Sequence, residues 1–148
     1  MCNFTTFEDV YQVFLRKIRD YDLAKLFDFD MEDIMFGYLV AAITKFKSCK
    51  KDITDINIEE QRFNCSLNIA EIDILANFMV YEWITPYVND EDLLKNTLNT
   101  SDYSNYSPAN LLSTMKSRQE EARQTARRLM NTYSLQGVKL VDKVKNRS

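Results

Sequence analysis

Residues 68–87 read NIAEIDILANFMVYEWITPY and predict a helix with a well-defined start. Asn68 is a good N-terminal cap, and Glu71 follows it at the spacing of a capping box. The apolar residues of the segment recur at intervals of three and four, which is the period of a helix that buries one face. Trp83 is the expected core anchor of this helix. Pro86 should kink or stop it, because proline has no backbone N–H to donate.

Two further helices are predicted before this segment. Thr5 or Thr6 opens the first, whose apolar stripe extends to Ile18. The second has Asp30 as its candidate cap and runs to about Lys47. Since well over a third of its surface is apolar, we expect this second helix to take a central position in the fold.

Residues 52–67 have a different pattern from the helices on either side. Ile53, Ile56 and Ile58 alternate loosely with polar residues, and residues 62–67 alternate polar with apolar. A period of two is typical of strands, so the segment predicts a short β-hairpin or an extended arm.

The last predicted helix is unusually long. Ser107 and Pro108 form a helix start, with a serine cap and proline in the first helical position. Nothing interrupts the pattern before about Ser134, and Gly137 stands where a terminating glycine is expected. Residues spaced by three and four form a heptad seam with small residues at its middle, which we expect to be an interface between copies of the chain. The seam consists of Leu112, Met115, Gln119, Ala122, Ala126, Leu129 and Tyr133.

The predicted fold is mainly α. It is a small helical bundle with one long C-terminal helix, a hairpin or arm around 52–67 and an extended C-terminal tail. Residues 1–137 form a single helical domain, and residues 138–148 form the tail. A length of 148 residues suits one domain, and only two glycines and two prolines are too few for the turns of a β-sandwich or barrel.

Basic residues on the long helix and in the tail are candidates for contacts with partners. The helix stripe has three readings: it faces DNA, it forms a charge ladder at a subunit interface, or it is merely solvated. The tail is either frayed or a docking segment for another protein. The stripe consists of Lys116, Arg118, Arg123, Arg127 and Arg128. The docking residues of the tail are Val138, Lys139, Leu140, Val141, Lys143 and Val144.

The composition argues against an enzyme. The chain has no histidine, which removes histidine-based nucleophile systems and histidine-ligated zinc. Its two glycines lie far apart, so it has no glycine-rich phosphate loop. The three cysteines form no CxxC pair. We therefore expect no catalytic residues, no metal and no cofactor.

Charge and hydropathy limit the partners. The net charge of −3 argues against a general nucleic-acid coat. No apolar run reaches the length of roughly 20 residues that a membrane span needs, so we expect no membrane partner. An acidic cluster before the second helix is either a charged helix start or a divalent-metal site of a nuclease. It consists of Asp28, Asp30, Glu32 and Asp33.

Several stretches together resemble a known family. The main stretch is Phe63–Pro86, and Ala41–Asp52, Leu93–Lys95 and Tyr106–Asn110 also fit the pattern. They resemble small structural proteins of tailed phages, the head–tail connector proteins, also called adaptor or head-completion proteins. The similarity covers about residues 34–134. Its motifs are apolar and aromatic, so they are typical of a fold more than of a chemical activity.

The resemblance implies a virion structural protein of the phage neck. Helical protomers would join a homo-oligomeric ring below the portal, usually a dodecamer that follows the portal's symmetry. Such a ring extends the DNA channel, which genomic DNA crosses without sequence-specific contact, and offers a platform to the next neck or tail-completion protein. The C-terminal arm of such adaptors often reaches toward the portal protein. The expected location is the virion neck, and the host cytoplasm during assembly.

An alternative from another class stays open. The chain would then be a small phage- or cell-encoded helical regulator that binds a host protein or DNA. Such a regulator would be free in the cell and absent from particles, whereas a connector would be part of them.

Overall fold

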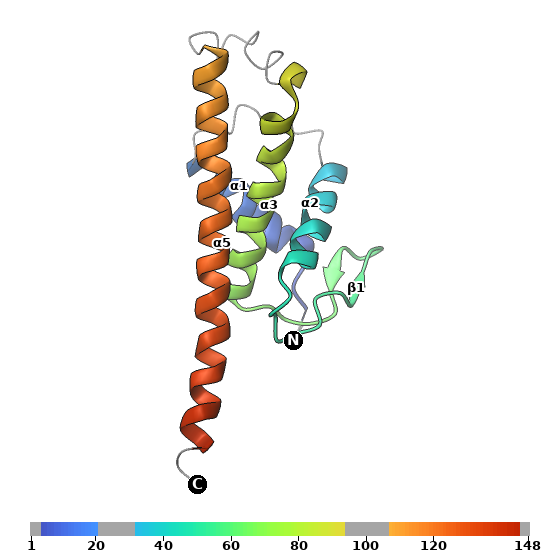
Figure 1. The fold of residues 1–148 in the computed structure, drawn as a ribbon. Coiled ribbons are helices and arrows are strands. Elements are labelled where there is room, and N and C mark those ends of the chain that lie inside the picture. Colours follow the sequence, from blue (N-terminus) through green and yellow to red (C-terminus); the bar gives the residue numbers. More distant parts are fainter. Residues whose placement is uncertain (1–3, 21–31, 94–106, 146–148) are drawn as a thin grey trace.

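The computed structural model describes residues 4–20, 32–93 and 107–145 (Figure 1). Its helices are α1 (Phe7–Asp20), α2 (Glu32–Lys45), α3 (Ile69–Asn89) and α5 (Pro108–Lys145), and its strands are β1 (Ile56–Asn57) and β2 (Arg62–Phe63). The predicted class is confirmed: a mainly helical bundle with one long C-terminal helix and a small hairpin. The predicted cap Asp30 lies outside the described residues.

Helix α3 occupies the centre of the bundle. It packs against α1, α2 and α5, and it is buried on most of its circumference. The predicted capping box is confirmed, because the Asn68 side chain accepts from the Glu71 backbone N–H and Glu71 accepts from the Asn68 backbone N–H, both at 2.8 Å. Trp83 is 1% exposed, and its ring packs edge-on against Phe14 of α1 with centroids 6.4 Å apart. Trp83 is therefore the core anchor that was predicted.

The expected central position of α2 is wrong. One face of α2 packs against α3, but its outer face leaves Ile34 and Val40 about 40% exposed. A Cβ at Gly37, which is also exposed, would meet no atom within 4 Å from elsewhere in the described chain. An apolar composition shows that a helix is hydrophobic on several faces, but it does not decide which helix has neighbours on all of them. The longer α3 takes the middle position (Figure 1).

Pro86 does not stop α3, which continues to Asn89. The proline removes one hydrogen bond in the last turn, where few others depend on it. The backbone N–H of Asp90 then donates to the Pro86 carbonyl at 2.9 Å and closes the helix. The helix thus ends one turn after Pro86, which was expected to kink or stop it.

The segment between α2 and α3 forms a β-hairpin, which is one of the two alternatives that its sequence pattern predicted. The strands are antiparallel, with Ile56 opposite Phe63, and Gln61 in the turn has a positive φ of 51°. The N-terminal residues extend this small sheet. Phe63 donates its N–H to the Thr5 carbonyl at 2.8 Å, and Thr5 donates to the Cys65 carbonyl at 3.0 Å. The N-terminus is thereby attached to the hairpin.

The heptad seam of α5 packs against α3 of the same chain. Met115, Ala122 and Ala126 are fully buried, and Tyr133 is 8% exposed. The side-chain amide of Gln119 donates to Thr85 Oγ1 on α3 at 3.0 Å. Leu112 and Leu129 are half-buried at the edges of the contact.

The prediction that this seam joins two copies of the chain is therefore wrong. A heptad pattern shows that one face of a helix packs against another helix, but it does not show whether that helix belongs to the same chain. Here the apolar face of α5 packs against α3. The small side chains of Ala122 and Ala126 let the two helix backbones approach closely.

Helix α5 does not end before Gly137 but continues to Lys145. The predicted extended tail and the domain boundary after residue 137 are therefore wrong, since residues 138–145 belong to the same helix. A single glycine costs only about 1 kcal/mol in a helix relative to alanine. It ends a helix when it adopts a left-handed conformation, which no glycine in the described residues does.

Replacing Ala122 with leucine should lower the free energy of unfolding by about 1–3 kcal/mol, because the added methylenes overpack the contact between α3 and α5. The matched control is Ala109→Leu in the exposed first turn of the same helix, which should change stability by less than about 0.5 kcal/mol. Urea unfolding followed by circular dichroism measures both. Equal effects of the two substitutions would contradict the burial of the seam.

Candidate functional site

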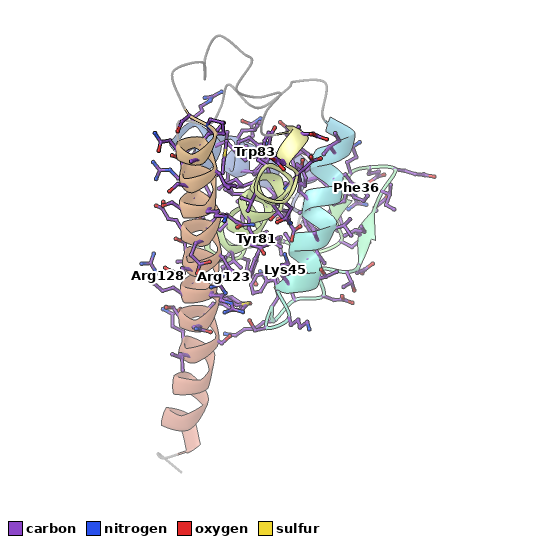
Figure 2. The ribbon with its side chains drawn as sticks, turned by 45° about the horizontal axis from the view of Figure 1, so that its top comes forward. Phe36, Lys45, Tyr81, Trp83, Arg123 and Arg128 are labelled. Atoms are coloured by element: carbon purple, nitrogen blue, oxygen red, sulfur yellow. The ribbon has the colours of Figure 1, made fainter. Side chains whose placement is uncertain are left out.

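The basic residues predicted to form one stripe on α5 point in different directions. Arg118 and Arg123 form ion pairs along the helix with Glu121 and Glu120. In Figure 2, Arg123 points toward α2 and α3, whereas Arg128 points away from them. The structure therefore brings only part of the predicted set to one place. That part lies between α5 and the two helices beside it.

A groove lies where α2, α3 and α5 meet, with a volume of about 600 Å³. We call it the basic groove, because four of its lining residues are cationic and none is acidic. Aromatic and apolar side chains of α3 and α5 complete its wall. The lining residues are Thr44, Lys45, Lys47, Phe78, Tyr81, Arg123, Arg127 and Met130.

Two of the four cations of the basic groove, Lys45 and Arg123, form ion pairs with nearby glutamates. Lys45 pairs with Glu82, and its ammonium lies 4.3 Å from the centroid of the Tyr81 ring (Figure 2). Partial burial lowers the pKa of Lys45. Arg123 donates from Nε to Glu120 at 2.9 Å, and this hydrogen bond lowers the pKa of Glu120.

The other two cations carry the net charge of the groove. Lys47 and Arg127 are exposed, and neither pairs with a carboxylate at hydrogen-bond distance among the described residues. Arg127 also contributes, more weakly than Arg123, to the lowered pKa of Glu120. Lys47 and Arg127 therefore leave the groove positive at the surface of a chain with a net charge of −3.

A second group of polar side chains, two of them buried and two half-buried, lies where α3 begins. We call it the Glu71 cluster: Glu71, Lys51, Tyr133 and Cys49. The Glu71 side chain is 1% exposed and accepts from Lys51 Nζ and from the Tyr133 hydroxyl, each at 2.8 Å. The Cys49 thiol lies 3.7 Å from the same carboxylate. The cluster joins the start of α3, the segment after α2 and the middle of α5.

Tyr133 occupies the junction of these three segments. Its hydroxyl accepts from the Lys50 backbone N–H at 2.9 Å while it donates to Glu71. Its ring packs edge-on against Phe46, with centroids 5.3 Å apart. Burial raises the pKa of Tyr133, and the hydrogen bond to the Glu71 carboxylate raises it further.

The charge state of Glu71 follows from its surroundings. Burial acts to raise the pKa of this carboxyl, but hydrogen bonds from Lys51, the Asn68 backbone and Tyr133 outweigh burial. Its pKa lies below the ordinary value, so Glu71 is ionised at neutral pH. Burial raises the pKa of the Cys49 thiol, which favours its neutral form.

The Glu71 cluster has a structural role, because it connects three segments of the chain through hydrogen bonds. Both carboxylate oxygens are occupied by donors from the protein, so neither is open to a substrate. Sequence reasoning found Glu71 as a capping residue but missed its other partners. Lys51 and Tyr133 lie 20 and 62 residues away, and no local spacing connects them with Glu71.

The predicted acidic cluster lies largely beyond what the structure describes. Asp28 and Asp30 are outside the described residues, and only the helical backbone of Glu32 and Asp33 is inside them. Among the side chains that are described, no group of three histidine, cysteine, aspartate or glutamate residues is placed to hold a metal ion.

The C-terminal end of α5 extends beyond the rest of the described chain (Figure 1). Tyr133 lies beside Glu71, in the first turn of α3, and the two helices run in opposite directions. The ribbon of α5 continues beyond the start of α3 after this point (Figure 1). The predicted docking residues, Val138 to Val144, all belong to this projecting end.

Comparisons of the chain with protein-family models, with curated proteins and with solved structures found no match. None of the described helices is both long and apolar enough to cross a bilayer.

Replacing Glu71 with glutamine should lower the free energy of unfolding at neutral pH by about 1.5–3 kcal/mol, because hydrogen bonds to a buried charge are lost. Since the pKa of Glu71 is lowered on folding, its stabilising contribution is present above the unfolded value of 4.5 and is lost as the pH falls through the folded value. The variant should therefore lose less stability than the wild type on acidification. Urea unfolding at a series of pH values measures this.

The matched control is Glu120→Gln, which also removes a carboxylate of lowered pKa. Because Glu120 lies on the surface, its replacement should have a much smaller effect at neutral pH. If the Glu71 variant matched the wild type in stability and in pH dependence, the assigned role of the cluster would be wrong.

Proposed function

We propose that this protein is a structural protein of a tailed-phage neck, an adaptor that forms a ring below the portal and joins head to tail. The ring would extend the channel through which genomic DNA passes without sequence-specific contact. The portal protein and the next neck or tail-completion protein would bind its two ends.

The observation that carries this proposal is the projecting end of α5. At 1.5 Å per residue, the 38 residues of α5 span about 57 Å, whereas the 21 residues of α3 span about 32 Å. The additional turns carry Val138, Leu140, Val141 and Val144 past the end of their partner helix. A helical end with so many aliphatic residues would gain stability by packing against another protein.

The body of the protein also supports a role in assembly. Its outer surface includes exposed apolar residues on α2 and the positive basic groove. These surfaces are different from each other, and a contact between unlike surfaces can repeat around an axis until it closes into a ring. The portal-binding element in this proposal is the helical end of α5, in place of the extended tail expected from the sequence.

The location of the protein tests the proposal most directly. The protein should be present in purified particles, at a fixed ratio to the portal protein, as quantitative mass spectrometry would measure. A cryo-EM reconstruction of the neck should contain it between portal and tail. A protein free in the infected cell and absent from particles would contradict the proposal and favour a regulator.

Replacing Leu140 with aspartate should weaken binding to portal rings by about tenfold or more. Burying a leucine contributes about 1.5–3 kcal/mol, and each 1.4 kcal/mol is a factor of ten in affinity. The free energy of unfolding of the isolated protein should stay unchanged, since α3 does not reach this residue. Sedimentation with purified portal rings measures binding, and urea unfolding provides the control. Unchanged binding would show that the projecting end is not the docking element.

A further inference from the structure

The tip of the β1–β2 hairpin combines an exposed apolar side chain with two carboxylates. Ile58 is 65% exposed, and Glu59 and Glu60 follow it. Glu60 pairs with Arg62, whereas Glu59 pairs with no cation at hydrogen-bond distance among the described residues. The tip therefore presents an exposed aliphatic side chain directly beside a carboxylate.

The tip is held in a defined shape. The Glu60 backbone N–H donates to the Asn57 side chain at 3.1 Å, and the Gln61 N–H donates to the Ile58 carbonyl at 3.3 Å. Gln61 then takes its positive φ and returns the chain to β2. Because the backbone is already ordered, insertion of the tip would cost little conformational entropy.

The basic groove has the complementary chemistry. Lys47 and Arg127 supply exposed positive charge, and half-buried Met130 supplies apolar surface in the same groove, with buried Phe78 behind it. An occupant that matches both features needs an aliphatic side chain and at least one carboxylate close together. Ile58 and Glu59 of the hairpin tip meet this requirement.

The tip and the groove belong to different sides of one molecule. The hairpin lies beyond α2 and points away from α5, whereas the groove lies between α2 and α5 (Figure 1). The tip of one chain therefore does not fill its own groove. A contact between tip and groove has to join two copies, and since the two surfaces differ, the contact is head-to-tail.

We propose that the hairpin tip of one copy, residues 58–60, docks in the basic groove of the next copy. This inference rests on the proposed function in one respect, because that function requires copies of the chain to join one another. It replaces the α5 seam, which is buried within the chain, as the contact between copies. Each copy in a closed ring would make the contact twice, once through its tip and once through its groove.

Charge reversal in the full-length chain tests the contact. The variants Glu59→Lys and Arg127→Glu should each weaken self-association by about tenfold or more, because each places like charges together. Sedimentation velocity over a range of protein concentrations measures this. Arg128→Glu is the matched control, since it makes the same change one residue further along α5, outside the groove, and it should associate as the wild type does.

Mixing the two variants separates a specific contact from a folding defect. In an equimolar mixture, the lysine introduced at position 59 of one chain can face the glutamate introduced at position 127 of the other. The native Glu59 can likewise face the native Arg127. Association in the mixture should therefore exceed that of either charge-reversed variant alone at the same total concentration. A wild type that stays monomeric, single variants that associate normally, or a mixture without recovery would each overturn the inference.

The two proposals fail in different ways. If the protein associates through tip and groove but is absent from particles, the neck function is contradicted and the contact between copies is not. If the protein is present in particles but its charge-reversed variants still associate, the contact is contradicted and the neck function is not.

Discussion

The buried carboxylate of Glu71 is the interaction on which the arrangement of the chain depends. Removing a carboxylate from water costs several kcal/mol, and the cost is offset only when donors surround it. Here the donors come from the α3 cap, from Lys51 after α2 and from Tyr133 on α5. These segments are far apart in sequence, so the carboxylate is satisfied only when all of them are in their native places. The network thereby selects one packing arrangement from the several that apolar helix surfaces would tolerate.

The register of α5 on α3 follows from this constraint. With Tyr133 fixed beside Glu71 and Gln119 beside Thr85, the helices pack antiparallel along their shared length. The same register carries the end of α5 past the bundle and places Arg123 and Arg127 next to α2. The projecting end and the basic groove are therefore two consequences of one packing arrangement. Both proposed interactions use surfaces that this arrangement creates.

Local features of the sequence predicted local structure well. The capping box predicted at Asn68 forms, and of the two candidate starts of the first helix, Thr6 makes the reciprocal hydrogen bonds, with Asp9; in both cases the partner lies three residues away. The predictions that were wrong concern which helices, far apart in sequence, pack against each other. The α5 seam has the pattern of an interface between copies, yet α3 satisfies it, and the apolar α2 lies at the side of the bundle. Gly137 was expected to end the last helix, but it lies within α5, which continues to Lys145.

Composition and short spacings were enough to predict the helical class, the starts of α1, α3 and α5, and the change of pattern at residues 52–67, because these depend on neighbours within a few residues. The central position of α3, the binding of Glu71 to Lys51 and Tyr133, and the meeting of Lys47 and Arg127 in one groove depend on how the whole chain packs. The physical reason is that periodicity specifies which face of a helix is buried, whereas the partner of that face is chosen by the packing and polar satisfaction of the whole chain.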